Sequence, residues 1–72
     1  MRVFFDTYVG RVLEPDADGL ELAHESDARA AALAAVAELA ADYRHDPGPF
    51  AVVARTEGGR VLVRADLKLT VG

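Results

Sequence analysis

The residues with the clearest chemical potential form an acidic stretch near the start of the chain. Carboxylates stand at Glu14, Asp16 and Asp18, a glycine follows at Gly19, and a further carboxylate comes at Glu25. In a twelve-residue calcium loop, oxygen ligands occupy positions 1, 3, 5 and 12, and glycine occupies position 6. The spacing therefore makes the four acidic residues candidate ligands of a divalent cation such as calcium.

Other features of the same stretch favour a polar turn. Pro15 stiffens the backbone, Glu21 stands where calcium loops usually carry an aliphatic residue, and Glu14 stands where they usually carry Asp. The residues before the stretch have a strand pattern, whereas a helix normally enters such a loop. We therefore favour a turn that leads into a helix, with calcium binding at residues 14–25 as an alternative.

No set of residues points to catalysis. His24 and His45 flank a segment of about 20 residues, which as a helix would separate them by roughly 30 Å. The two histidines therefore cannot bind one metal ion within a single chain. Ser26 is the only serine, and Gly58 and Gly59 lie in an expected hairpin turn instead of a phosphate-binding loop. We predict that the protein is not an enzyme and needs no cofactor.

The charge of the chain argues against nucleic acid as a partner. The formal net charge is −4 at pH 7, which opposes contact with a phosphate backbone. Arg60, Arg64 and Lys68 form a basic row with Arg55 nearby, but Asp66 interrupts it. We interpret the row as a solvated strand face.

Length and composition predict one small domain, residues 1–72. The chain has no cysteine, so neither a disulfide nor a thiolate zinc site stabilises it. A chain this short has marginal stability, and self-association is one way to bury more surface. The start lacks a signal-peptide pattern, and the longest apolar run, residues 30–37, is too short to span a bilayer. We predict a cytoplasmic protein with no membrane partner.

Hydrophobic periodicity predicts the elements that must position these residues. They are strands at residues 2–9 and 12–14, a brief extended piece at 20–22, a helix from Ser26 to about Arg44, and strands at 50–56 and 60–71. Pro15 ends the first hairpin, and the sequence Pro47-Gly48-Pro49 stops the helix. The predicted fold is α+β with the order ββαββ: an antiparallel four-stranded sheet with one helix packed on one face. The order of the strands within the sheet stays open.

A single helix leaves the other face of the sheet without a cover. Strict alternation assigns apolar residues to that face, namely Phe4, Tyr8, Val53 and Leu62. The last predicted strand has about twice the usual length and is expected to extend beyond the domain. We therefore predict a protein-interaction module that forms a homo-oligomer, or contacts another protein, through this face or this strand.

Several ordered motifs resemble a known group of proteins. The chain begins with R-x-F-F-D at residues 2–6, continues with P-D-x-x-G-x-E-L at residues 15–22, and turns its last hairpin at residues 57–60. These motifs are similar to those of a family of small bacterial proteins catalogued as a domain of unknown function. The resemblance implies an αβ fold, a cytosolic setting and no assigned catalytic residue.

The same resemblance directs attention to three residues of the turn. We expect Gly19 to set the backbone and Asp16 to fasten the turn, whereas Glu21 has no role that the pattern explains. A looser similarity is to HicB-type antitoxins, which implies a toxin-neutralising or regulatory partner domain as a further alternative.

Overall fold

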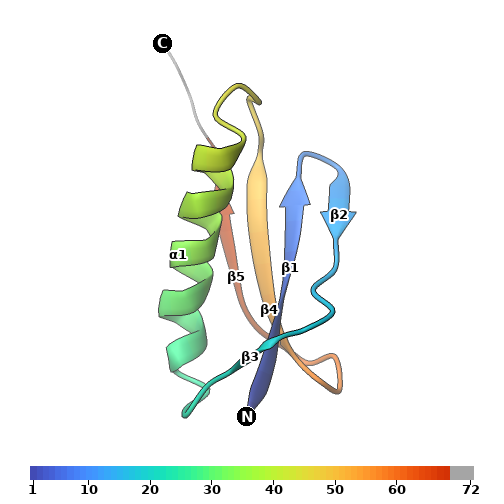
Figure 1. Ribbon diagram of the computed structural model, residues 1–72, viewed down its shortest axis with the longest axis vertical. Helices are drawn as coiled ribbons and strands as arrows, with labels where there is room; N and C mark the ends of the chain where they lie inside the picture. Colours follow the sequence, from blue (N-terminus) through green and yellow to red (C-terminus); the bar gives the residue numbers. More distant parts are fainter. Residues whose placement is uncertain (69–72) are drawn as a thin grey trace.

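The computed structural model describes residues 1–68 of the chain, and this part contains one helix and five strands (Figure 1). In chain order these are β1 (Arg2–Val9), β2 (Val12–Glu14), β3 (Leu20–Glu21), α1 (Asp27–Asp42), β4 (Phe50–Thr56) and β5 (Val61–Leu67). The predicted α+β class, with one helix and an antiparallel sheet, is confirmed. The sheet has five strands instead of the predicted four, because the short extended piece forms β3 and pairs with β1.

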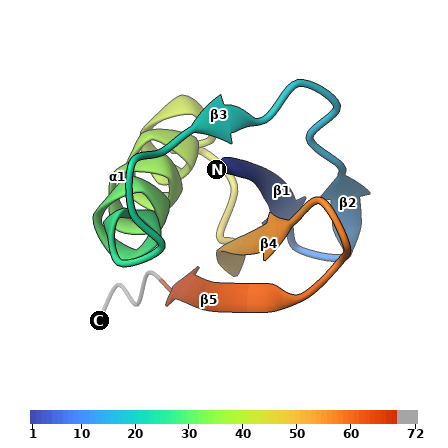
Figure 2. The same ribbon diagram turned by 90° about the horizontal axis from the view of Figure 1, so that it is seen from below.

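The sheet has the order β2-β1-β4-β5, and β3 pairs with β1 as well. All pairings are antiparallel. β1 and β4 form the central pair, from Val3 opposite Thr56 to Val9 opposite Phe50. The two hairpins are thus joined through strands that lie far apart in the sequence. Seen end-on, the sheet curves around α1 (Figure 2).

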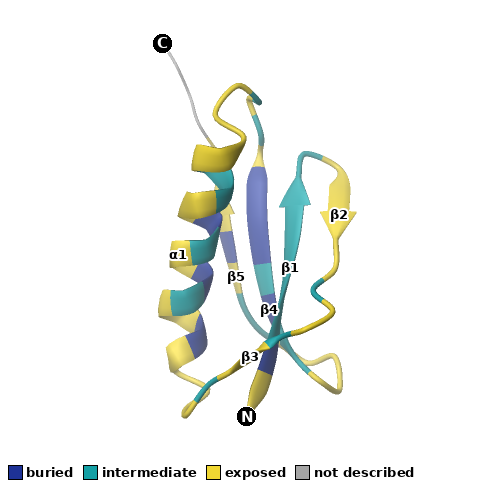
Figure 3. Ribbon diagram, viewed as in Figure 1, coloured by how far each residue is buried: buried dark blue, intermediate teal, exposed yellow. Residues whose placement is uncertain are grey.

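The core lies between α1 and the central strands. Ala28, Ala32 and Val36 are the buried residues of the helix, and their spacing of four places them on one stripe. The short alanine side chains let the helix approach β4, whose Phe50 and Val52 are fully buried. Figure 3 shows this buried stripe of α1 facing the buried part of β4. The core is therefore small and rests on close backbone approach.

The ends of α1 differ from the expectation. Ser26 precedes the helix, but its side chain makes no capping hydrogen bond. The carboxylate of Asp27 instead accepts the N–H of His24 at 3.1 Å. The helix ends at Asp42, two residues before Arg44, and its last turn has no basic residue. Within residues 1–68, no helix combines the length and apolar character that a bilayer-spanning segment needs.

β5 departs from regular pairing near its start. The register shifts between Ala54 and Arg55, so Leu62 is an extra residue in a β-bulge. Leu62 then packs against the buried cluster that contains Ala28 of the helix. The assignment of Leu62 to the uncovered face is therefore wrong, because simple alternation does not allow for a bulge.

The last strand is also described over a shorter range than predicted. The prediction covered residues 60–71, whereas β5 begins at Val61 and ends at Leu67. Arg60 belongs to the preceding turn, where its carbonyl accepts the N–H of Thr56 at 2.9 Å. Residues 69–71 of the predicted strand lie outside the described residues.

Candidate functional site

Asp16 lies in the loop between β2 and β3, and its carboxylate accepts three backbone N–H groups. Oδ2 accepts the N–H of Phe5 at 3.0 Å, and Oδ1 accepts the N–H groups of Asp18 and Gly19 at 3.1 Å each. The two bonds from within the loop form the local turn that aspartate favours. The bond from Phe5 ties this turn to β1.

The bond to Phe5 fills a gap in the outer ladder of β1. β2 pairs with β1 from Thr7 to Val9, and β3 pairs with its first two residues. Between these two short pairings, the N–H of Phe5 faces the loop, where Asp16 supplies the acceptor. A strand would supply a backbone carbonyl at this position. One carboxylate therefore replaces a missing piece of strand.

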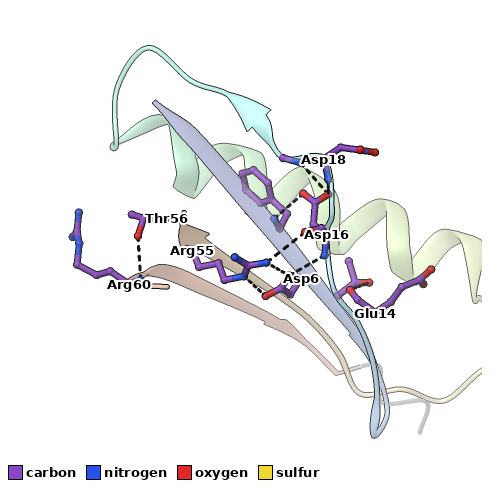
Figure 4. A network of polar contacts seen from close by, with 10 residues as sticks. Asp6, Glu14, Asp16, Asp18, Arg55, Thr56 and Arg60 are labelled. Atoms are coloured by element: carbon purple, nitrogen blue, oxygen red, sulfur yellow. Dashed lines mark hydrogen bonds and ion pairs between the residues drawn. The ribbon is translucent and has the colours of Figure 1, made fainter. Parts of the chain in front are cut away.

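A second carboxylate, Asp6 on β1, connects the loop to β4. Its Oδ1 accepts the N–H of Asp16 at 2.9 Å, and its Oδ2 accepts the Nε–H of Arg55 at 2.7 Å. Arg55 also donates from Nη2 to Oδ1 of Asp6 at 3.3 Å and to the carbonyl of Asp16 at 3.4 Å. Figure 4 shows these groups as one connected network. Two strands and a loop are thus held together by three side chains.

The guanidinium of Arg55 also covers the ring of Phe4. Its central carbon lies 4.8 Å from the ring centroid, within the range of a cation–π contact. The Asp6 and Arg55 side chains are only 14% and 27% exposed. The ion pair is therefore shielded from water more than an ordinary surface pair.

Hydrogen bonding lowers the pKa of both carboxyls. For Asp6 the largest effect on the pKa is the hydrogen bond from Arg55, which outweighs the opposing effect of burial. For Asp16 the largest single effect is burial, which raises the pKa, but the three backbone donors and the charge of Arg55 together outweigh it. A general acid or base needs a pKa near the working pH. These two carboxylates are instead held ionised as acceptors.

Gly19 and Glu21 complete the turn. Gly19 has a φ of +73°, and a Cβ at this position would lie 2.9 Å from Cγ of Arg2 and 3.1 Å from the Phe4 ring. Both the backbone angle and the space therefore call for glycine. Glu21 pairs across the strands with Arg2, with 3.6 Å between Oε2 and Nη2, but it is 65% exposed. Such an exposed pair adds little to stability.

The four candidate calcium ligands are not gathered around one point. The oxygens of Asp16 accept N–H groups, and Glu25 is held by Arg60 at 2.9 and 3.2 Å. Asp18 donates its backbone N–H to Asp16, and the backbone carbonyl of Glu14 accepts the hydroxyl of Thr7 on β1. Among residues 1–68, no three His, Asp or Glu side chains lie where they could hold a metal ion.

The face of the sheet opposite α1, called the open face here, carries a balanced grid of side chains. Its three rows across β1, β4 and β5 are Phe4, Arg55 and Val61; Asp6, Val53 and Arg64; and Tyr8, Ala51 and Asp66. Arg55 pairs with Asp6 and Arg64 with Asp66, so these rows have no net formal charge. Arg64 also lies 5.6 Å from the centroid of the Tyr8 ring. The predicted contact residues Phe4, Tyr8 and Val53 are half-buried on this face.

β5 forms the other boundary of the sheet. Among the described residues, no strand pairs with its outer edge. The strand is seven residues long, and its Val61 and Leu67 are 58% and 37% exposed. The opposite boundary is formed by strands of three and two residues. β5 is therefore the longest continuous stretch of unpaired strand edge in the described part of the chain.

The sequence pattern gives no signal of the ion pair between Asp6 and Arg55. Alternation within residues 2–9 places Asp6 on the same strand face as Phe4 and Tyr8, and Arg55 lies near the basic row that we interpreted as a solvated strand face. The β1–β4 register places Phe4 opposite Arg55 and so brings Arg55 diagonally beside Asp6. Only the strand order, which the sequence left open, reveals this. The other arginines of that row are in ion pairs too: Arg60 with Glu25 and Arg64 with Asp66.

Comparison with known proteins agrees with the family resemblance at the level of the whole domain. No curated protein and no solved structure matches the chain significantly. Residues 2–68 match the family described as "Domain of unknown function (DUF6894)". This match covers all the strands and the helix of the described structure, and the chain therefore belongs to the DUF6894 family.

Proposed function

We propose that this chain is a non-enzymatic protein-interaction module that associates with a second copy of itself through its sheet. The observation that carries the proposal is the outer edge of β5, which is seven residues long and has no strand partner within residues 1–68. The free N–H and C=O groups of an edge strand are a template for pairing with another chain.

The modest core supports the same proposal. Apart from Phe50, the buried side chains between α1 and the sheet are those of alanine and valine. Small domains bury a limited fraction of their surface, and association adds buried area. A second copy on the sheet would compensate for the small side chains of the helix stripe.

The edge of β5 is a better contact surface than the open face. On the open face, the rings of Phe4 and Tyr8 already lie under Arg55 and Arg64. On β5, by contrast, Val61 and Leu67 are exposed. The balanced charge of the open face would not repel a second copy, so Phe4, Tyr8 and Val53 remain secondary contact residues of this proposal.

The other functions suggested by the sequence have less support. The low pKa values of Asp6 and Asp16 and their backbone partners fit a structural role better than acid–base catalysis. The oxygens of Asp16 that calcium binding at residues 14–25 would use already accept three N–H groups. A HicB-like regulatory role would use the same β5 edge with a different protein. A cytoplasmic location is part of the proposal.

Sedimentation velocity tests the proposal. We expect a dimer whose fraction rises from low to high micromolar protein concentration. Val12, exposed on the opposite boundary, provides a control, because Val12→Thr is expected to leave the dimer unchanged. A single monomeric species at high micromolar concentration would contradict the proposal.

A further inference from the structure

The backbone groups of β5 that point away from the sheet belong to Arg64 and Asp66. In an antiparallel ladder, successive residues direct their N–H and C=O groups to alternate edges. On β4 the even-numbered residues face β5, as the bond from the N–H of Thr56 to the carbonyl of Arg60 indicates. Beyond the bulge, Val52 lies opposite Ala65. The groups of Ala65 therefore point inward to β4, and those of its two neighbours point outward.

This alternation limits how two β5 edges can pair. Outward-pointing residues must face outward-pointing residues to exchange hydrogen bonds. Within the regular part of the strand, three symmetric antiparallel registers satisfy this condition. Two of them place Arg64 opposite Arg64, or Asp66 opposite Asp66, and like charges directly opposite each other are unfavourable. The third is centred on Ala65 and places Arg64 opposite Asp66 twice.

The register centred on Ala65 also matches the other face of the strand. It places Val63 opposite Leu67 of the second copy, so apolar residues face each other next to the opposed charges. The side chains of Arg64 and Asp66 are 55% and 58% exposed. Within one copy, Nε of Arg64 already donates to both carboxylate oxygens of Asp66, at 3.0 and 3.1 Å. Each arginine would then have a carboxylate beside it and another across the interface.

We propose that two copies of the chain join antiparallel through their β5 edges, with Ala65 opposite Ala65 and Arg64 opposite Asp66 of the second copy. This proposal rests on the proposed self-association and adds its surface, symmetry and register. The arrangement extends the order β2-β1-β4-β5 into one continuous sheet with both helices on the same face. Arg64 and Asp66 exchange four backbone hydrogen bonds across the joint.

Charge reversal tests the opposed pairs. Arg64→Asp places Asp opposite Asp66 twice, and Asp66→Arg places Arg opposite Arg64 twice. Each variant alone is expected to dimerise at least about tenfold more weakly, because both cross-strand pairs become repulsive. An equal mixture of the two variants restores opposite charges at both pairs and is expected to restore the dimer. Arg11→Asp, in the turn after β1, is the matched control and should leave association unchanged.

Cysteine pairs test the register directly, because the chain has no cysteine of its own. Directly opposed residues of a hydrogen-bonded pair lie about 5.5 Å apart at Cα, within the range of a disulfide. We expect a mixture of Arg64→Cys and Asp66→Cys to form a cross-linked dimer on mild oxidation. Either variant alone should not, because each new thiol then faces a native Asp or Arg across the joint.

The outcomes separate this inference from the proposed function. A native dimer by sedimentation, combined with no cross-link in the cysteine mixture, would refute the β5 register and leave self-association standing. Equal cross-linking by Arg64→Cys alone would refute it as well, because that result requires Arg64 opposite Arg64. A strictly monomeric native chain would overturn both. Slower hydrogen exchange at the Arg64 and Asp66 amides with rising concentration is the further result expected, since face-to-face association leaves these amides open.

Discussion

The two boundaries of the sheet are built in opposite ways. Beside β1, the outer edge is divided between β2, β3 and a loop in which Asp16 takes the place of a strand carbonyl. Beside β5, the edge is a single strand from Val61 to Leu67, which is regular beyond the bulge at Leu62. Short edge strands, proline and tight loops block pairing with other chains, whereas a long edge permits it. Polar side-chain chemistry therefore closes the edge beside β1, called the closed edge here, whereas the outer edge of β5 has no strand partner within residues 1–68.

Lowering the pH tests the closed edge as a whole and is expected to have the largest effect. The folded pKa values of Asp6 and Asp16 lie below the ordinary value of 3.8, so their ionised forms stabilise the fold. This stabilisation is fully present above the ordinary pKa and is lost as the pH falls through the lowered values. Urea midpoints should therefore stay level from pH 7 to about 5 and fall steeply below about 4. An Asp6→Asn, Asp16→Asn double variant should lose much of this dependence, and an unchanged dependence would contradict the assignment.

Removing one carboxylate charge tests the loop itself. Asp16→Asn replaces one acceptor oxygen with a donor that faces an N–H group, so the variant loses at least one bond from Phe5, Asp18 or Gly19. We expect the free energy of unfolding to fall by about 1.5–3 kcal/mol, the usual range for hydrogen bonds to a charged group. Asp18→Asn is the matched control, since Asp18 serves the loop through its backbone. Equal urea midpoints for the two variants would contradict the role of Asp16.

Gly19→Ala tests the space inside the closed edge. The φ of +73° alone should cost about 1–2 kcal/mol for alanine, and the contact with Arg2 adds to that. Gly10→Ala is the control for the angle, because its φ is +60° and no described atom lies within 4 Å of the added Cβ. The difference between the two melting temperatures isolates the contact. If Gly10→Ala were the more damaging, the packing of Arg2 over the turn would be in doubt.

The smallest effect on stability is expected at the outer edge of β5, where a substitution should change association instead of folding. Arg64→Asp changes an exposed side chain, so the urea midpoint of the dilute monomer should hardly move. Arg64→Asp should also raise the dissociation constant of the dimer. Asp16→Asn should instead lower the urea midpoint and leave the dissociation constant unchanged, after correction for the fraction of unfolded chains. Measuring the urea midpoint and the dimer dissociation constant of both variants therefore distinguishes the role of one edge from that of the other. A parallel loss of both quantities in both variants would show that the two edges do not have separate roles.

Local patterns in the sequence predicted much of the fold. Alternation and helical periodicity located the four main strands and the helix, and the turn chemistry of Asp16 and Gly19 marked the loop that organises the first edge. Those signals depend on residues near each other in the chain. Leu62 was misplaced because a single extra residue in a bulge reverses the alternation.

The centre of the candidate site was not predictable in the same way. The network depends on β1 lying beside β4, and that pairing brings together Asp6 and Arg55, which are 49 residues apart. Neither residue carries a local signal of this partnership. The acidic spacing that first suggested calcium has another cause, because Asp16 and Glu25 bind N–H groups and an arginine in different parts of the molecule.

The β1–β4 pairing joins residues that are far apart in the sequence, and this separation affects how the chain folds. α1 and the β4–β5 hairpin need only local contacts, whereas docking β1 must close a loop that holds nearly the whole domain. We therefore expect β1 to dock late and the Asp16 loop to close after it. In stopped-flow experiments, Asp16→Asn should then speed unfolding and hardly change refolding; slower refolding instead would put β1 in the folding nucleus. The carboxylate of Asp16, which closes the edge beside β1, would then control the unfolding rate and so the lifetime of the native state.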